Sequence, residues 1–369
     1  MAFECGQTIS EYEFIDVVER SKTGIAYKVR NTEAQRFELL KVLPRTLQDD
    51  QDRVERFLRE IKVHGRLVHP NIEAFYNATQ LAGQMVMTTE LVEGVTLAGR
   101  LDLGPLPIAE AVNLATQALA ALAYAHGQGI IHREVTPANM VITPEGFLKL
   151  SGFGLAKSVN DPSLTQMGAV MGSLYYMSPE QVKGLPNLDA RSDIYSLGVV
   201  LYEMLTGRRP FEAASHFDIM LAHVKGDVTS PRKLNPALTP TLEQVVLKAM
   251  AKEAERRYGT AEEFASSLEY ALAGKAPPAA MLEEAVQPMA AFEQAVAQRT
   301  PQEVVPVVNA SHSVHVGAST PSSGFGSPQP GARPAARQSK PVRPVELIVA
   351  AVTLVVAFLS ALAITSLGK

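Results

Sequence analysis

Residues 132–139 read His-Arg-Glu-Val-Thr-Pro-Ala-Asn, and residues 151–154 read Ser-Gly-Phe-Gly. The first stretch places a cationic, an acidic and an amide side chain close together in the chain, at Arg133, Glu134 and Asn139. The second stretch places a phenylalanine between two glycines and begins twelve residues after Asn139. The patterns on either side of these stretches decide the fold class.

Further from these stretches, apolar and polar residues alternate over residues 12–29, 37–43 and 86–91, which predicts strands. Helical spacing marks residues 51–67, 108–126, 192–205, 216–224, 242–252 and 261–273. Strands therefore gather in the first part of the chain and helices in the second. This order predicts an α+β fold in which a small sheet lobe joins a larger helical lobe.

The composition narrows the class of protein. The chain has 369 residues, and 46% of them are apolar, so it has room for a full hydrophobic core. A formal net charge of -4 gives no electrostatic reason to expect nucleic-acid binding. The single cysteine, Cys5, excludes an internal disulfide and suits a reducing compartment. The first residues lack the basic and apolar regions of a signal peptide, so none is predicted.

Two further zones are predicted after residue 274. Residues 275–345 are rich in Ala, Pro, Ser, Gly and Val, which predicts a linker. Residues 346–367 are predicted to form a transmembrane helix, because the 21 residues from 347 to 367 carry no charge. A helix of that length spans roughly 32 Å, which matches the hydrocarbon core of a bilayer. Basic residues before it predict a cytoplasmic N-terminal part anchored to the inner (cell) membrane.

The two stretches of the opening are similar to the paired signature of protein kinases, His-Arg-Asp-x-Lys-x-x-Asn followed by Asp-Phe-Gly. Over about residues 12–274 the chain resembles a bacterial Hanks-type serine/threonine kinase. The resemblance implies a two-lobed protein-kinase fold, with an antiparallel-sheet N-lobe at 12–91 and a helical C-lobe at 92–274. Residues 1–11 would form an N-terminal arm.

The resemblance also implies where ATP would bind. Of the three glycines in the loop that covers the phosphates, only Gly24 remains, so residues 19–24 are interpreted as an ordinary hairpin turn in preference to a phosphate-binding loop. Lys41 matches the strand lysine that contacts the phosphates, and Glu60 matches its helix partner. Such an ion pair is also a structural tie between elements. The hinge matches residues 90–94, beginning with Glu90 and Leu91.

Three positions around this pocket leave alternatives open. Leu39 stands where the family has an alanine against adenine, so it either partly fills the adenine site or is accommodated by a shifted strand. Ala26 stands where a valine usually closes the same pocket, which returns some space. His64 is either a polar member of the stacked spine that links the lobes or a core histidine with a hydrogen-bond partner.

The catalytic stretch departs from the family at three positions. Glu134 replaces the aspartate base and is one methylene longer, Thr136 replaces a lysine, and Gly152 replaces the aspartate that binds magnesium. Asn139 is retained and is the remaining candidate metal ligand, unless an acid elsewhere, such as Asp161, substitutes. ATP binding is therefore doubtful, and Mg²⁺ binding is expected to be weak or absent.

Architectural residues of the family are kept. Glu180 is expected to pair with Arg257, and Asp193 is expected to brace the catalytic loop. The retained framework and altered catalytic residues lead to the hypothesis of a membrane-anchored pseudokinase. It would act as a scaffold or allosteric regulator of a protein partner, such as an active kinase or another signalling protein. The alternative is an active or weakly active ATP-dependent serine/threonine kinase that uses Glu134 as base.

Overall fold

A computed structural model describes residues 3–20, 24–44, 50–153, 157–158 and 173–275. All of these residues belong to one compact unit, Met1–Pro288. The predicted linker begins at residue 275, the last described residue, so the rest of it lies outside the described residues. The predicted transmembrane helix also lies outside them. Asp161 also lies outside them.

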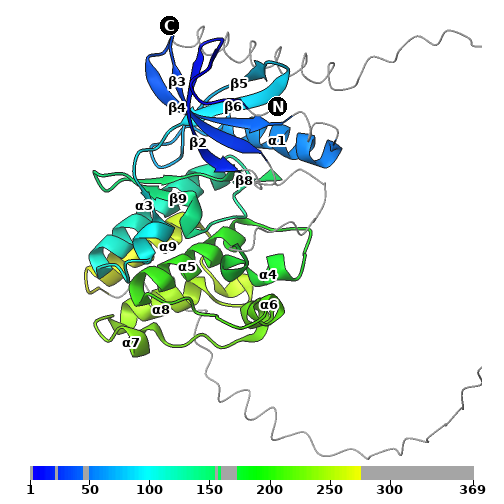
Figure 1. Cartoon of the computed structure of the whole chain (residues 1–369). Coiled ribbons are helices and arrows are strands. Elements are labelled where there is room, and N and C mark those ends of the chain that lie inside the picture. The colour runs from blue at the N-terminus through cyan, green and yellow to red at the C-terminus, as the bar shows by residue number, and fades with distance from the viewer. Residues whose placement is uncertain (1–2, 21–23, 45–49, 154–156, 159–172, 276–369) are drawn as a thin grey trace, which may run out of the picture. The chain divides into compact units, whose positions relative to one another are not determined.

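The N-lobe is built on an antiparallel sheet of six strands in the order β1-β2-β3-β4-β6-β5 (Figure 1). One face of the sheet carries an aromatic and aliphatic core that includes Tyr12, Phe14, Tyr27 and Leu40. The strands are β1 (Thr8–Ile9), β2 (Tyr12–Arg20), β3 (Ile25–Asn31), β4 (Arg36–Leu43), β5 (Phe75–Leu81) and β6 (Gln84–Glu90). The structure has strands at all three predicted stretches, with residues 12–29 divided into β2 and β3, whereas the sequence analysis missed β1 and β5.

Helix α1 (Gln51–His64) is the one long helix among the described N-lobe residues (Figure 1). It begins after Asp50, whose side chain accepts a hydrogen bond from the backbone N–H of Arg53. It ends before Gly65, three residues earlier than predicted. The apolar residues Val54, Phe57 and Ile61 are buried, which fixes the rotation of the helix. This rotation directs Glu60 toward β4.

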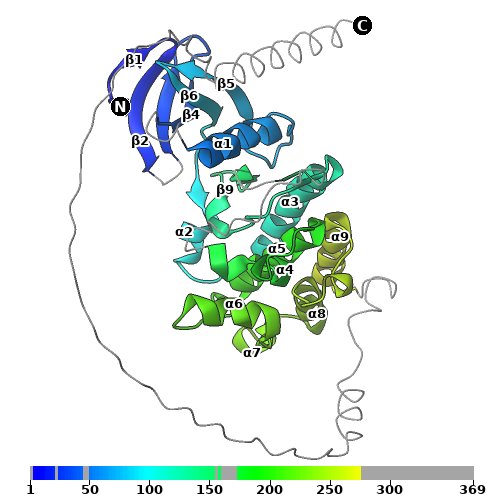
Figure 2. The same cartoon turned by 90° about the vertical axis from the view of Figure 1, so that its right-hand side faces the viewer.

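The C-lobe is helical, and its long helices α3 and α5 pack with α8 and α9 around one core (Figure 2). The chain enters this lobe through β7 (Val95–Thr96) and α2 (Leu97–Leu101). The helices that follow are α3 (Ile108–Gly127), α4 (Pro179–Val182), α5 (Ala190–Thr206), α6 (His216–Lys225), α7 (Pro231–Leu234), α8 (Pro240–Ala249) and α9 (Ala261–Leu272). The expected α+β, two-lobed architecture is confirmed.

A second predicted helix, in the C-lobe, also has the wrong boundaries. The helix expected at residues 242–252 begins at Pro240, after the N-cap Thr239, and ends at Ala249. The Lys252 ammonium donates hydrogen bonds to the carbonyl oxygens of Ala222 and His223 at 3.0 and 2.9 Å. Lys252 thus lies beyond the end of α8 and is bound to the end of α6. Apolar spacing alone does not reveal such a long-range contact.

Between the helices of the C-lobe, the catalytic stretch forms short strands and turns. Strands β9 (Met140–Ile142) and β10 (Leu148–Leu150) pair with each other, and β7 pairs with β9. Strand β8 (Ile130–Ile131) pairs with β11 (Lys157–Ser158), and a 3-10 turn, η2 (Pro137–Asn139), lies between β8 and β9. This arrangement brings residues 132–139 beside residues 151–153.

Among the described helices, α3 alone is long and apolar enough to cross a membrane. Half of its most apolar stretch is buried inside the protein, where α3 packs against α5 and α9. Buried packing accounts for this composition, because a helix enclosed by protein is apolar on most of its surface.

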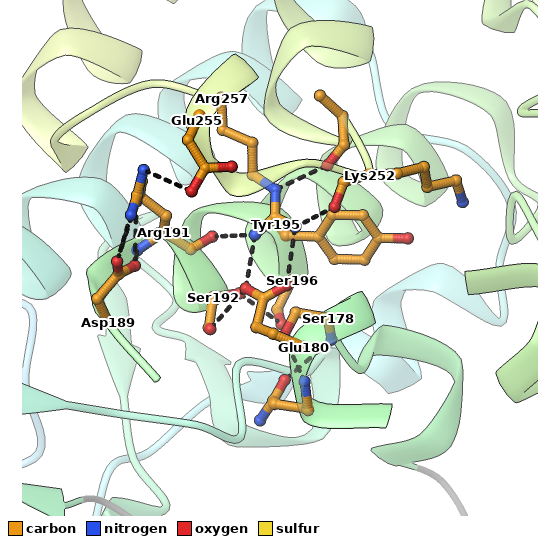
Figure 3. Close-up of polar contacts among 12 residues, drawn as sticks. Ser178, Glu180, Asp189, Arg191, Ser192, Tyr195, Ser196, Lys252, Glu255 and Arg257 are labelled. Carbon is orange, nitrogen blue, oxygen red and sulfur yellow. Dashed lines mark hydrogen bonds and ion pairs between the residues drawn. The ribbon is translucent and has the colours of Figure 1, made fainter. Parts of the chain in front are cut away.

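The predicted ion pair between Glu180 and Arg257 is confirmed (Figure 3). Two guanidinium nitrogens of Arg257 donate to the two carboxylate oxygens of Glu180 at 2.7 and 2.8 Å. The Ser192 hydroxyl donates to the same carboxylate at 2.7 Å. Burial alone would raise the pKa of Glu180, but the bonds and charge of Arg257 hold this pKa below its usual value. The pair ties the start of α4 to the segment before α9.

Candidate functional site

An ion pair joins β4 to α1 within the N-lobe. We call the region where these N-lobe elements approach residues 132–153, as His64 does in contacting Phe153, the cleft. The Lys41 ammonium donates to the Glu60 carboxylate at 3.0 Å, and both side chains are largely buried. In the register of the sheet, Ala26 lies opposite Lys41 and Thr89 lies opposite Leu39. The residues predicted to contact phosphate are therefore brought together at the cleft, with the adenine-side positions on neighbouring strands.

The register of β4 determines the face of the sheet on which the Leu39 side chain lies. Residues 38–43 pair in unbroken register with β6, and residues 36–42 pair in unbroken register with β3. The side chain of Leu39 therefore lies on the same face of the sheet as that of Lys41, two residues later. A leucine at this place reduces the room for a base.

The remaining glycine of the phosphate loop has a structural role. A side chain at Gly24 would place its first carbon 2.5 Å from the carbonyl oxygen of Val42 in β4. Such a contact is far below ordinary van der Waals distance, so this position requires glycine for the close approach of two backbones. Strands β2 and β3 on either side pair as a hairpin, with Arg20 opposite Ile25.

The hinge residues connect the lobes through a polar contact. The Glu90 carboxylate accepts hydrogen bonds from the backbone N–H of Ala74 at 3.1 Å and from the Lys149 ammonium at 2.9 Å. The following residue, Leu91, is half-buried and directly continues β6 into the C-lobe. The Glu90 side chain thus stabilises the hinge, and this role does not depend on a nucleotide.

Asp193 in α5 holds the catalytic loop, as expected. Its carboxylate accepts hydrogen bonds from the backbone N–H groups of His132 and Arg133, each at 2.8 Å. The ring of His126 contacts the same carboxylate at 2.8 Å. Burial alone would raise the pKa of Asp193, yet these bonds keep it below its usual value. The loop is therefore fixed in place although its reactive residues differ from those of the family.

The structure places Asn139 against Gly152. The Asn139 amide donates to the backbone carbonyl of Glu134 at 2.8 Å. Gly152 has a φ of +84°, and a first side-chain carbon built on it would lie 2.6 Å from the Asn139 Cγ. The amide of Asn139 therefore occupies the space that a side chain at position 152 would need. The backbone conformation at this position also disfavours any residue other than glycine.

These residues do not fit the magnesium ion that a protein-kinase fold implies. Gly152 supplies no oxygen ligand from a side chain, and Mg²⁺ requires hard oxygen donors at octahedral positions. The Asn139 side chain is directed to a backbone carbonyl and to the space beside Gly152. Within the part of the chain that the structure describes, no group of three or more His, Cys, Asp or Glu side chains is close enough to hold a metal ion.

Glu134 is a partly buried carboxylic acid. Its pKa is raised to about 7, chiefly by burial and further by the charge of Glu60, although a hydrogen bond with Asn139 opposes the shift. A group with this pKa is divided between acid and carboxylate near neutral pH, which suits a general base. The other altered position, Thr136, is buried just before η2 and brings no positive charge to the loop.

The raised pKa of Glu134 has a consequence for stability. A carboxyl whose pKa rises from 4.5 to about 7 on folding favours the folded state below pH 4.5, and this contribution is lost as the pH rises through about 7. We therefore expect the native protein to lose stability relative to Glu134→Gln between pH 5 and pH 8. Urea unfolding at both pH values measures the difference in free energy of unfolding between Glu134→Gln and the native protein. This difference should be about 1–3 kcal/mol at pH 8 in favour of the variant. An unchanged difference would contradict the raised pKa.

His64 is a member of an aromatic stack and also has a hydrogen-bond partner. Its ring lies 5.5 Å from that of Phe153 and 6.2 Å from that of Phe75, and Phe153 lies 4.5 Å from His132. The fully buried His64 ring donates through Nε2 to the carbonyl oxygen of Glu73 at 2.6 Å. Both alternatives from the sequence are therefore confirmed together, and the spine is continuous between the lobes.

One residue of the cleft was missed by the sequence analysis. Glu73 is only 3% exposed, and its carboxylate accepts a hydrogen bond from the hydroxyl of Thr89. It lies in the irregular segment before β5, where no periodic pattern indicates which side chains are buried. Its backbone N–H donates to the carbonyl oxygen of Leu150 at 3.0 Å, so contacts between the lobes determine its burial.

Comparison with known proteins gives a consistent result. A family profile described as the protein kinase domain matches residues 12–268. The chain is 36% identical over 254 residues to the probable serine/threonine-protein kinase PknB of Lactococcus lactis, which covers 68% of this chain and 40% of that protein. It is 34% identical over 268 residues to the serine/threonine-protein kinase PrkC of Bacillus subtilis, which covers 72% of this chain and 41% of that protein.

Solved structures agree with this result. The kinase domain of PknI from Mycobacterium tuberculosis has a TM-score of 0.57 and 26% sequence identity, and the match covers 74% of this chain and 100% of that domain. The chain spans about two fifths of the length of the curated relatives that it matches. The matched region, the two-lobed fold and the residues of the cleft together show that this chain belongs to the protein kinase domain family, among bacterial serine/threonine kinases of the Hanks type.

Proposed function

We propose that this protein is a catalytically impaired pseudokinase that regulates a partner through binding. The observation that carries the proposal is the pair Asn139 and Gly152. The position that would supply a magnesium ligand has no side chain, and the Asn139 amide occupies the adjacent space. Phosphoryl transfer in protein kinases depends on this metal to neutralise the charge of the phosphates. Thr136 stands in place of the family's lysine, so a second source of positive charge is also absent.

Binding is the proposed role because the framework that shapes the surface is intact. The Glu180–Arg257 pair, the Asp193 brace and the aromatic spine are all formed. A rigid kinase fold presents the same surface whether or not it transfers phosphate. The partner that we propose is a signalling protein such as an active kinase, and this choice rests on analogy with the fold.

We further propose that the kinase fold is held at the cytoplasmic side of the inner membrane by residues 346–367. The support is the uncharged stretch of 21 residues at 347–367, preceded by basic residues. Restriction to the membrane surface would raise the effective concentration of a partner held at the same surface.

The second candidate is a working serine/threonine kinase. The comparisons favour it over the first, because the relatives are named as serine/threonine-protein kinases. Two features of the cleft also favour it. The Lys41–Glu60 pair is formed, and Glu134 has a pKa of about 7, as a general base requires. Such an enzyme would need metal ligands from outside the residues described.

Nucleotide binding by the full chain separates the two candidates. We expect that adding Mg²⁺ will not raise the melting temperature measured with ATP, whether or not ATP alone produces a thermal shift. A shift that requires Mg²⁺ and disappears in Asn139→Ala would support the working kinase and contradict the pseudokinase. Glu145→Ala is a suitable control, because Glu145 lies in an exposed turn outside the cleft.

A further inference from the structure

The buried acid Glu73 is held rigidly at the rear of the cleft. Three parts of the residue are fixed: its carboxylate by the Thr89 hydroxyl, its carbonyl by the His64 ring at 2.6 Å, and its N–H by the Leu150 carbonyl at 3.0 Å. A side chain that is 3% exposed and bound in this way has little freedom to turn away from its neighbours. Its position is therefore a property of the folded cleft.

The sheet register places this acid on the same face as Lys41. Thr89 lies opposite Leu39, and Met87 lies opposite Lys41, along the paired strands β4 and β6. Side chains two residues apart in a strand share a face, so Thr89 and Lys41 are diagonal neighbours on one face. The carboxylate that accepts the Thr89 hydroxyl is therefore held on the Lys41 face of the sheet, close enough for its charge to act on the ammonium of Lys41.

Two other acids are near the same ammonium. Glu60 contacts it at 3.0 Å. Glu19 lies on β2, opposite Ala26 of β3, and Ala26 in turn lies opposite Lys41 of β4. Burial alone would lower the pKa of Lys41, but the charges of Glu60, Glu73 and Glu19 raise it above its usual value. Of these three carboxylates, Glu60 forms an ion pair with the ammonium, whereas the charges of Glu73 and Glu19 act on it from farther away.

This arrangement of charges disfavours the binding of phosphate groups near Lys41. The lysine charge that would attract a nucleotide's phosphates is already compensated by Glu60, and Glu73 adds a negative charge that water screens poorly because it is buried. No metal ligand at Gly152 offsets the charge of a triphosphate. A ligand without phosphates does not meet this repulsion.

We propose that Glu73 is a specificity-determining residue that makes the cleft discriminate against nucleoside triphosphates relative to uncharged nucleosides. The proposal rests on the proposed function, in which the cleft does not use ATP with Mg²⁺ for phosphotransfer. It goes beyond that function by assigning the exclusion of phosphate to one buried side chain. The repulsion acts on each phosphate charge, so it increases from nucleoside to monophosphate to triphosphate.

The substitution Glu73→Gln tests the proposal in the full chain. Glutamine keeps an oxygen that accepts the Thr89 hydroxyl but removes the charge. We expect the dissociation constant for ATP without metal to fall by about tenfold or more, and that for adenosine to change by less than about twofold. Isothermal titration calorimetry with adenosine, AMP and ATP gives the three values.

Glu38→Gln is the matched control. Glu38 is 1% exposed and lies on β4, but the alternation of the strand places it on the opposite face from Lys41. We expect it to leave ATP binding unchanged. The proposal is overturned if Glu73→Gln leaves the dissociation constant for ATP unchanged or ATP binding undetectable. It is also overturned if the dissociation constants for adenosine and ATP fall by the same factor. Failure of the proposed function would appear elsewhere, as phosphotransfer by the native chain in the presence of Mg²⁺.

Discussion

Replacing Arg257 with alanine is expected to lower the free energy of unfolding by about 3–5 kcal/mol. The Arg257 side chain is 0% exposed and forms two hydrogen bonds with Glu180. Its remaining donors satisfy three backbone carbonyl oxygens, those of Ala251, Arg191 and Lys252 (Figure 3). The substitution leaves a mostly buried carboxylate and these carbonyls without their partner. Chemical denaturation of the full chain, monitored by circular dichroism, measures the loss.

The neighbouring residue provides the control for this prediction. Arg256 is exposed, so Arg256→Ala is expected to change the free energy of unfolding by less than about 0.5 kcal/mol. Arg257→Lys should lose part of the stability, because an ammonium keeps the charge but cannot form the paired bonds of a guanidinium. Equal effects of Arg256→Ala and Arg257→Ala would show that the ion pair does not support the C-lobe.

The second large effect concerns the restoration of catalysis. We expect the combined substitution Gly152→Asp, Thr136→Lys and Glu134→Asp to raise Mg²⁺-dependent phosphotransfer at least about 100-fold above the native protein. Each change returns one part of the family's chemistry: a metal ligand, a cation at the phosphates and a base of the usual length. Transfer of radiolabelled phosphate from ATP to a generic protein substrate measures the gain.

Gly152→Asp is expected to destabilise the protein, in the combined variant as well as alone. The residue would have to adopt a φ of +84° and would place its first side-chain carbon 2.6 Å from the Asn139 Cγ. The backbone conformation alone costs roughly 1–2 kcal/mol. Gly146→Asp is the matched control, because Gly146 has the same φ of +84° but no atom within 4 Å of the added carbon. A larger loss at position 152 than at position 146 isolates the contact with Asn139.

The residues that could be predicted from sequence share a physical property. Lys41, Glu60 and Asp193 were predicted because they match positions of the kinase family, and each lies on a regular strand or helix that carries the match. The Glu180–Arg257 pair was predictable because each partner is charged and occupies a recognisable family position. The two-lobed fold followed from the order of strand and helix patterns.

The features that were missed depend on contacts between irregular segments. The burial of Glu73 depends on Thr89 and Leu150, which lie 16 and 77 residues away in sequence. The position of Asn139 against Gly152 arises from a turn and a glycine with positive φ, for which apolar spacing carries no signal. Lys252, which was predicted to lie in α8, likewise makes contacts with α6, 29 and 30 residues away in sequence.

The cleft of this protein retains the framework of a protein kinase but lacks the oxygen ligand that would hold magnesium at Gly152. The most direct test is radiolabelled phosphotransfer by the native full chain with ATP and Mg²⁺, measured beside Lys41→Met. We expect both proteins to show the same background incorporation. Incorporation by the native chain that Lys41→Met abolishes would contradict the proposed pseudokinase and establish the protein as a working kinase.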